Sequence, residues 1–226
     1  MKYAVQRAYL KVRRRPFEDD FRGVPELRLT QDALILDVGA NRGQSVDALA
    51  LTAPGRRVVS FEPNPLLAAR LRGRYGKHAH WTLVEAAVGR QEGTFTLFIP
   101  AYRGYVFDGL ASLNRDEAET WLASRICRFD PRLLSIEEFE VQTVSLDDLA
   151  LAPALIKIDV QGLELDVLQG GVGTLEAYSP VLLIETPIAE VGAFLKDLDY
   201  APMHWSGDRL VAGSGDTLNT FFVRSG

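Results

Sequence analysis

Residues 34–43 read LILDVGANRG, and this stretch decides the fold. An apolar run reaches the acid Asp37, a glycine-rich turn follows, and a helical pattern begins at Gln44. A second apolar run, at residues 58–61, ends in Glu62. Two such runs, each followed by a helical pattern, are typical of parallel strands whose carboxyl ends hold a nucleotide-like cofactor. We therefore expect Glu62 to accept hydrogen bonds from a ribose diol.

The rest of the chain continues the alternation of strand and helix that is typical of an α/β domain. Asn64-Pro65 is expected to cap and open a helix that ends at Gly73 or Gly76. Further strands are expected at residues 81–84, 94–99, 140–145, 155–160, 181–184, 200–205 and 218–223, and further helices at 44–51, 163–169 and 186–198. The last two strands are expected to be joined by a glycine-rich loop, residues 207–215.

The composition indicates one domain, which we place at residues 31–226 after a basic N-terminal helix and linker at residues 1–30. The chain has 226 residues, 47% of them hydrophobic, and a net charge of −5, which does not favour a nucleic-acid partner. The single cysteine, Cys127, excludes an internal disulfide. No apolar stretch approaches the roughly 20 residues of a membrane span, and no signal peptide is recognised, so we expect a cytoplasmic protein without stable membrane insertion.

The first fifteen residues carry six basic side chains and no acid. They are Lys2, Arg7, Lys11, Arg13, Arg14 and Arg15. One interpretation is attraction to anionic lipid or to an acidic substrate, and the other is a solvated helix that Pro16 ends. We favour the second interpretation because the apolar face of this helix, Val5, Ala8, Tyr9 and Val12, is small.

The turn after the first strand discriminates between cofactors. A dinucleotide fold needs G-x-G-x-x-G, and here Asn41 replaces the middle glycine that lets the backbone approach a pyrophosphate. A nicotinamide-dependent oxidoreductase is therefore disfavoured, and no Gly-Lys-Ser/Thr follows to make a P-loop. What remains suits a cofactor with a ribose and no phosphate, such as S-adenosylmethionine. The carboxylate of Asp37 would suit its ammonium group, directly or through water.

Five motifs occur in an order that resembles the FkbM family of S-adenosylmethionine-dependent methyltransferases. They are DVGANRG at 37–43, FEPNP at 61–65, ASL at 111–113, VSLD at 144–147 and IKIDVQGLE at 156–164. The resemblance runs from about residue 33 to about residue 186. It implies a class I methyltransferase fold, with a seven-stranded, mostly parallel sheet, a final antiparallel strand and helices on both faces. It also implies O-methylation of a hydroxyl on a sugar, a glycolipid or a polyketide-type natural product.

The same resemblance implies which positions bind the cofactor. It assigns the loop to Gly39, Asn41 and Gly43, the ribose to Glu62, and the adenine contact to residues 85–88, which include Ala86 and Ala87. We expect the rest of the cofactor site to be formed by Asp37, Ala40, Ser45, Pro63 and Asn64.

The resemblance places Asp159 and Lys157 next to the transferred methyl group. We expect Asp159 to be the general base, Lys157 to orient it or polarise the acceptor, and Glu185 to complete the acidic site. In a second interpretation Asp159 and Glu185 are oxygen ligands of Mg²⁺, although two carboxylates alone make a poor metal site. The family usually has Glu where this chain has Gln161, so any role of that acid must be filled differently here.

Residues 100–135 break the regular pattern and are rich in aromatic residues and arginine. We expect residues 100–140 to be the acceptor-binding insert, because aromatic faces suit sugar rings and arginines suit phosphate or carboxylate groups. The alternative is a packed insert that covers a sheet edge. The partner expected is a small-molecule or glycan acceptor, and a homodimer is compatible with the sequence. A catalytically inactive cofactor-binding scaffold of the same fold is the competing function.

Overall fold

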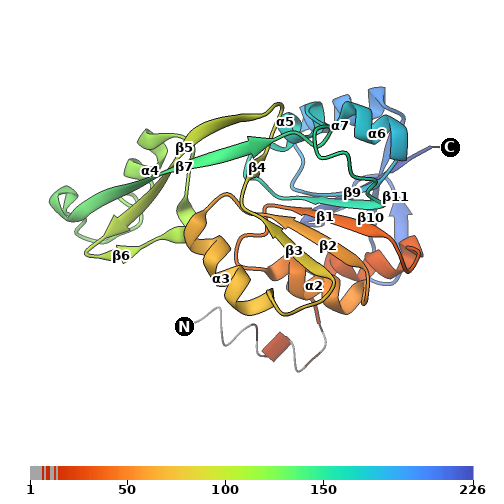
Figure 1. Cartoon of the computed structure of the whole chain (residues 1–226), viewed down its shortest axis with the longest axis horizontal. Coiled ribbons are helices and arrows are strands. Elements are labelled where there is room, and N and C mark those ends of the chain that lie inside the picture. The colour runs from red at the N-terminus through yellow and green to blue at the C-terminus, as the bar shows by residue number, and fades with distance from the viewer. Residues whose placement is uncertain (1–6, 8, 11–12, 14, 226) are drawn as a thin grey trace.

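The computed structural model describes residues 7, 9–10, 13 and 15–225. At its centre is an eight-stranded sheet of order β11-β10-β12-β9-β8-β1-β2-β3 (Figure 1). Its strands are β1 (Leu34–Val38), β2 (Arg57–Phe61), β3 (Trp81–Val84), β8 (Leu155–Ile158), β9 (Val181–Glu185), β10 (Tyr200–Trp205), β11 (Leu210–Ala212) and β12 (Asn219–Arg224). The sheet confirms the class I methyltransferase fold, with one strand more than the seven expected.

Strand directions also follow the expected topology. β1 pairs in parallel with β2 and β8, and the parallel pairing continues to β3 on one side and β9 on the other. β12 is antiparallel to both β9 and β10, which confirms the final antiparallel strand. The extra strand, β11, lies inside the glycine-rich loop 207–215, where no strand was expected. Gly207 and Gly213 have positive φ and turn the chain on either side of it.

Helices cover both faces of the sheet, which explains why every residue of β1 is buried. On one face lie α5 (Glu164–Gln169), α6 (Val172–Tyr178) and α7 (Ala189–Asp197), and on the other α2 (Gln44–Thr52) and α3 (Pro65–Tyr75) (Figure 1). Leu36 and Val38 pack on the side of α5–α7, whereas Ile35 packs with α2. No helix in the described part of the chain is long and apolar enough to cross a membrane.

The sequence pattern did not predict helix α6, because the residue that caps the start of this helix lies in a distant part of the chain. The sequence pattern ends a helix at Gly170-Gly171, yet α6 begins directly afterwards. The carboxylate of Asp147 accepts hydrogen bonds from the backbone N–H groups of Gly173 and Thr174, at 3.0 and 2.7 Å. This acid caps the helix from a distant loop, in the place of a local capping residue.

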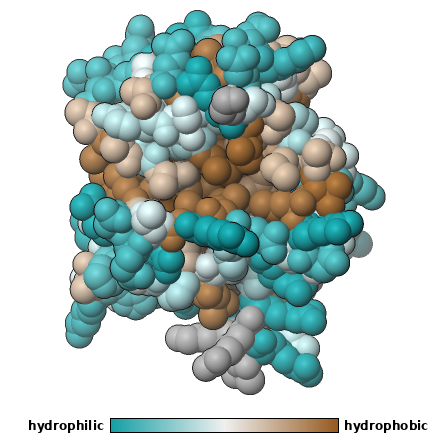
Figure 2. Space-filling view, turned by 90° about the vertical axis from the view of Figure 1, so that its right-hand side faces the viewer, coloured by the Kyte–Doolittle hydropathy of each residue, from teal (hydrophilic) through white to brown (hydrophobic). Residues whose placement is uncertain are grey.

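The layered arrangement is visible at the surface of the molecule. Figure 2 shows, on the side opposite the projecting arm of Figure 1, a band of hydrophobic residues across the middle, with hydrophilic residues above and below it. The band lies at the height of the central sheet, and the hydrophilic residues lie at the height of the two helical layers. Such a pattern is expected where the end of a sheet reaches the surface between two layers of amphipathic helices.

A second sheet forms an arm that projects from the domain (Figure 1). Its order is β4-β7-β5-β6, from β4 (Ala87–Val88), β5 (Gly93–Tyr102), β6 (Tyr105–Val106) and β7 (Leu134–Val144). β5 and β7 pair antiparallel over their whole length, so the segment between them spans residues 103–133, and the insert expected at residues 100–140 stays a prediction. Adjacent Glu137 and Glu138 interrupt the apolar–polar alternation. For this reason the sequence pattern did not predict the first half of β7.

The arm also carries three short helical segments. They are η2 (Asp108–Leu110), α4 (Arg115–Thr120) and η3 (Pro131–Leu133). Asn114 caps α4, and its side chain accepts from Asp116 N at 2.9 Å. The Glu117 carboxylate accepts from Ser112 Oγ at 2.8 Å.

The segment before β1 is an integral part of the core. η1 (Asp19–Leu27) is a 3₁₀ helix, and its Phe21 and Val24 are each only 1% exposed in the cluster that includes Leu49 and Phe221. A boundary at residue 30 stays a prediction, but residues 19–27 pack against the sheet rather than forming a linker. Of the apolar face expected near the N-terminus, Val5, Ala8 and Val12 lie outside the described residues.

We predict that Phe21→Ala lowers the free energy of unfolding by about 3–5 kcal/mol, because it removes a ring from a filled core. Urea denaturation measures the change. Glu26→Ala, at an exposed position of the same 3₁₀ helix, is the matched control and should stay within about 0.5 kcal/mol of wild type. If the two variants were equally stable, residues 19–27 would not belong to the folded core.

Candidate functional site

The loop after β1 is tied to the end of β2 by its own backbone. The N–H groups of Gly39 and Ala40 both donate to the carbonyl oxygen of Phe61, each at 3.0 Å. The N–H of Asn41 donates to Glu62 Oε2 at 2.7 Å, and that of Gly43 to the carbonyl oxygen of Ala40 at 2.8 Å. These four donors are satisfied inside the protein. The loop therefore does not direct them towards a pyrophosphate, as a dinucleotide site would.

Gly39 lets this loop lie directly against the end of β8. Its φ is +86°, and a Cβ built on it would overlap the carbonyl oxygen of Asp159. Gly43, with φ +85°, is similar, because a Cβ there would overlap the ring and hydroxyl of Tyr75. Both glycines are thus required by packing. The consequence for the site is that Asp159 adjoins the candidate cofactor loop.

Glu62 is a buried carboxylate at the end of β2, only 5% exposed. Its Oε1 accepts from the N–H of Asn64 at 2.9 Å, and its Oε2 accepts from Asn41. Burial raises the pKa of Glu62 to about 7, although these two N–H groups act in the opposite direction. Each oxygen has one of these protein donors and keeps a further acceptor position, which fits a ribose diol.

Asp37 lies fully buried beneath the loop. The Ser60 hydroxyl donates to its Oδ2 at 2.7 Å, and Trp81 Nε1 in turn donates to Ser60 Oγ at 2.9 Å. Oδ1 is a buried acceptor without a hydrogen-bond partner among the described residues, and Ser45 lies beside the carboxyl group. Burial raises the pKa of Asp37. An unsatisfied acceptor here fits a cationic group or a bridging water next to the loop.

The ends of β8 and β9 bring the three residues with expected catalytic roles together. Lys157 is 2% exposed, and its Nζ lies 3.8 Å from Asp159 Oδ2, so the two side chains form an ion pair. Glu185 hydrogen-bonds to Asp159, and burial together with this neighbour raises the pKa of Glu185 to about 8. Glu185 therefore keeps its proton to a higher pH than a carboxyl group in water.

Glu18 is a further carboxylate near the ends of β8 and β9, and the sequence pattern did not indicate it. Asn219 Nδ2 donates to Glu18 Oε2 at 2.8 Å, and Asn219 is the partner of Glu185 in the β12–β9 pairing. Burial raises the pKa of Glu18, and the charge of Lys157 opposes this rise. Nothing in the local sequence signals this placement, because it depends on the tertiary packing of the segment that precedes η1.

Other residues expected to bind the cofactor have structural roles in the loop region. Asn64 is 2% exposed and caps α3, since its Oδ1 accepts from Leu66 N at 3.0 Å. Ala86 is 4% exposed, and Ala87 belongs to β4, where it pairs with Thr143 of β7. Pro63, between Glu62 and Asn64, is half-buried. The adenine contact expected at residues 85–88 remains a prediction.

Gln161, the departure from the family pattern, contacts the candidate base. Its Nε2 donates to Asp159 Oδ1 at 3.0 Å. A glutamate at this position would place another carboxylate beside Asp159, whereas the amide donates to it. The expected magnesium alternative finds no support, because no three His, Cys, Asp or Glu residues in the described part of the chain are grouped to hold a metal ion.

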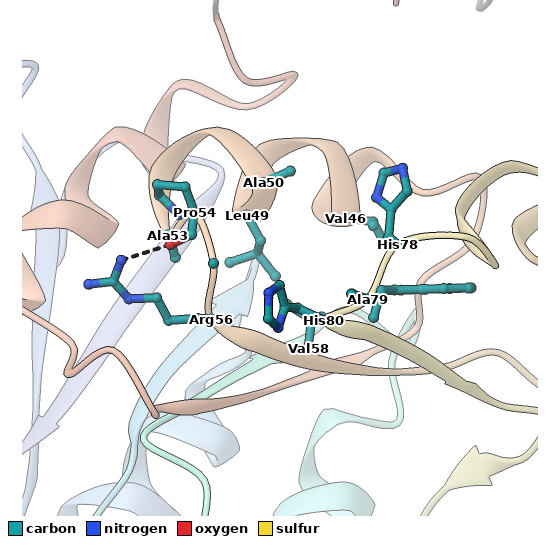
Figure 3. Close-up of a pocket in the computed structure, with 12 residues that line it drawn as sticks. Val46, Leu49, Ala50, Ala53, Pro54, Arg56, Val58, His78, Ala79 and His80 are labelled. Carbon is teal, nitrogen blue, oxygen red and sulfur yellow. Dashed lines mark hydrogen bonds between the residues drawn. The ribbon is translucent and has the colours of Figure 1, made fainter.

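A separate cavity of about 310 Å³ lies between α2 and the start of β3 (Figure 3). Leu49, Val58 and His80 point into the same space there, and the Arg56 guanidinium donates to the carbonyl oxygen of Pro54 at 2.8 Å. No acidic residue lines this cavity. It contains none of the expected site residues, so we do not place the reaction there.

Comparison with known proteins identifies relatives. The family model described as the methyltransferase FkbM domain matches residues 37–202. The chain is 29% identical to the AMB antimetabolite synthetase AmbE of Pseudomonas aeruginosa, over 93% of this chain and 10% of that protein. It is 30% identical to the 2-O-methyltransferase NoeI of Sinorhizobium fredii, over 64% of this chain and 59% of that protein. The chain thus spans only part of each relative's length.

Among solved structures, the methyltransferase FkbM from Methylobacillus flagellatus is similar, with a TM-score of 0.55 at 19% identity. The similarity covers 86% of this chain and 44% of that one. At this identity the comparison supports the fold.

We predict that Gly39→Ala lowers the free energy of unfolding by at least about 2 kcal/mol, because a side chain at positive φ must displace the loop from β8. Gly73→Ala is the control, since a Cβ at this exposed position of α3 meets no atom within 4 Å. That substitution should leave stability unchanged or raise it by about 0.5–1 kcal/mol. Thermal and urea unfolding would show the difference, and an equally stable Gly39→Ala variant would contradict the close contact.

Proposed function

The chain belongs to the FkbM family of methyltransferases, and we propose that it transfers a methyl group from S-adenosylmethionine to a hydroxyl of a sugar, a glycolipid or a polyketide-type natural product. One observation carries the proposal. The backbone of Gly39, in the candidate cofactor loop, packs against Asp159, so the cofactor site and the candidate base adjoin. The name of the 30% identical relative, a 2-O-methyltransferase, supports a hydroxyl as the acceptor. That of AmbE supports a natural product.

The cofactor supplies a sulfonium methyl, which is already a good electrophile. The protein must therefore align the acceptor hydroxyl, worth up to about 7–11 kcal/mol, and accept its proton. In this mechanism Glu62 would hold the ribose, and the buried carboxyl group of Asp37 would favour a cation near the loop. The cofactor would supply the methyl group, and Asp159 would accept the proton that the acceptor hydroxyl loses on methylation.

The neighbours of Asp159 suit the role of base. The raised pKa of Glu185 favours its protonated form, which can donate a hydrogen bond to Asp159. Lys157 and Gln161 both contact the Asp159 side chain, which restricts the orientation of its carboxylate. Glu185 and Lys157 then act as positioning residues around one base. These contacts around Asp159 argue against the catalytically inactive scaffold, because a protein that only binds the cofactor does not need an oriented base.

We propose that the acceptor binds beside residues 103–133. Fewer side chains of this segment are available to contact it than the sequence indicated. Several arginines of this segment are bonded within the arm. Arg125 stacks over Trp121 at 3.8 Å, Arg103 lies over Tyr102, and Arg132 pairs with Asp130 at 2.8 Å. Tyr105, by contrast, is 67% exposed. An exposed aromatic face favours a sugar ring or a flat polyketide.

The base role predicts that Asp159→Asn lowers kcat by about 10²–10⁴-fold and leaves the Kd for S-adenosylmethionine nearly unchanged. The assay is methyl transfer to an acceptor that wild type methylates, drawn from a panel of glycosides and macrolides. Asp166→Asn is the control, since this exposed carboxylate lies on α5, the next helix after β8, and pairs with Arg90. Wild-type turnover by Asp159→Asn at saturating acceptor would show that Asp159 is not the base.

The ribose role predicts a pH-dependent cofactor affinity. Glu62 ionises with a pKa of about 7, and the ionised form is the better acceptor for ribose hydroxyls. The Kd for S-adenosylmethionine should therefore rise as pH falls from 8 to 6, by up to about tenfold per unit below pH 7. Calorimetry on wild type and Glu62→Gln isolates this contribution, because the cofactor itself also titrates. Equal pH dependence in both proteins would contradict the assignment.

A further inference from the structure

Asp108 is a buried carboxylate inside the segment that we assign to the acceptor. It lies in η2 and is 3% exposed, although most of residues 103–133 are exposed or half-buried. Its Oδ1 accepts from Arg42 Nη2 at 2.7 Å, and its Oδ2 accepts from Arg70 Nη1. Its backbone carbonyl oxygen accepts from Asn64 Nδ2 at 2.9 Å. The side chain therefore has two cationic partners and the backbone a third donor.

All three partners lie outside the arm, Arg70 in α3 and the other two next to residues of the candidate cofactor site. Arg42 follows Asn41 in the loop after β1, and its carbonyl oxygen accepts from Arg74 of α3 at 2.7 Å. Asn64 follows the Glu62-Pro63 pair, and its N–H donates to the Glu62 carboxylate. One residue of the arm thus contacts both segments that hold Glu62 and Asn41.

The other ion pairs described for residues between β6 and the end of β7 are different, because both of their partners lie in the arm. Arg115 pairs with Glu119 and with Glu138 of β7, and Arg132 pairs with Asp130. Those pairs stay intact when the arm moves as a unit. The pairs of Asp108 do not, and separation would leave a buried carboxylate without its cations, which is strongly unfavourable. The position of η2 therefore depends on the loop that holds Arg42.

We propose that Asp108 is a positioning residue that couples cofactor binding to the ordering of residues 103–133, so that the acceptor region forms fully once S-adenosylmethionine is bound. The inference rests on the proposed function. A cofactor that fixes Asn41 and Glu62 also fixes their neighbours Arg42 and Asn64, and these hold Asp108. Coupling of this kind is reciprocal, so a bound acceptor raises the affinity for the cofactor by the same factor.

Hydrogen–deuterium exchange of the full chain, with and without S-adenosylmethionine, tests this coupling without knowledge of the acceptor. In wild type, the cofactor should slow exchange in residues 103–133 by about 5-fold to 150-fold, the usual range for coupled sites. In Asp108→Asn, which removes the charge and keeps the shape, the cofactor should still bind, and the slowing should be lost. Asp130→Asn, which breaks a pair inside the arm, should keep the wild-type response.

Two results would overturn the coupling while the proposed function stands. They are a wild-type protein that binds the cofactor with no change in the exchange of residues 103–133, and an Asp108→Asn variant with the full wild-type response. A chain that does not bind S-adenosylmethionine at all would overturn the proposed function and the coupling together. If Asp108→Asn does not fold, Arg70→Ala replaces it, since this side chain is 60% exposed and supplies one of the two cations. Its response should be reduced, and an undiminished response would contradict the proposal.

Discussion

The contact between the backbone of Gly39 and the carbonyl oxygen of Asp159 is the constraint on which the rest of the site depends. It brings the loop after β1 and the end of β8 together with no side chain between them. Because β1 lies between β2 and β8 in the sheet, Glu62 is then fixed on one side of the loop and Asp159 on the other. The proposed cofactor contact and the proposed base are thereby placed by one parallel sheet.

The charges at this edge explain which ligand fits it. Five carboxyl groups gather here around a single buried ammonium group, that of Lys157, among the described residues. They are Glu18, Asp37, Glu62, Asp159 and Glu185. Burial raises the pKa of four of them, so each of these four releases its proton at a higher pH than the same group in water. A cationic cofactor offsets the remaining negative charge, which is consistent with a sulfonium.

The sequence predicted those parts of the fold in which local pattern and tertiary burial agree. β1, β2, β3, α2 and α3 were located within about two residues, and Asn64 was recognised as the cap of α3 from its own side chain and the following proline. Elements that depend on distant residues were missed. The start of α6 needs Asp147, the placement of Glu18 needs Asn219, and the first half of β7 needs its pairing with β5. The roles of Asp37, Glu62 and Asp159 were expected from motif order, while the contacts that join them appear only in three dimensions.

In the proposed site the cofactor lies across the ends of β1, β2 and β8, with its sulfur facing Asp159. A crystal structure with bound S-adenosylhomocysteine would locate it. We expect ribose hydroxyls within hydrogen-bond distance of the Glu62 carboxylate, and a sulfur atom on the side of the loop where Asp159 and Glu185 lie. A nucleoside bound elsewhere, for example in the cavity between α2 and β3 shown in Figure 3, would contradict it.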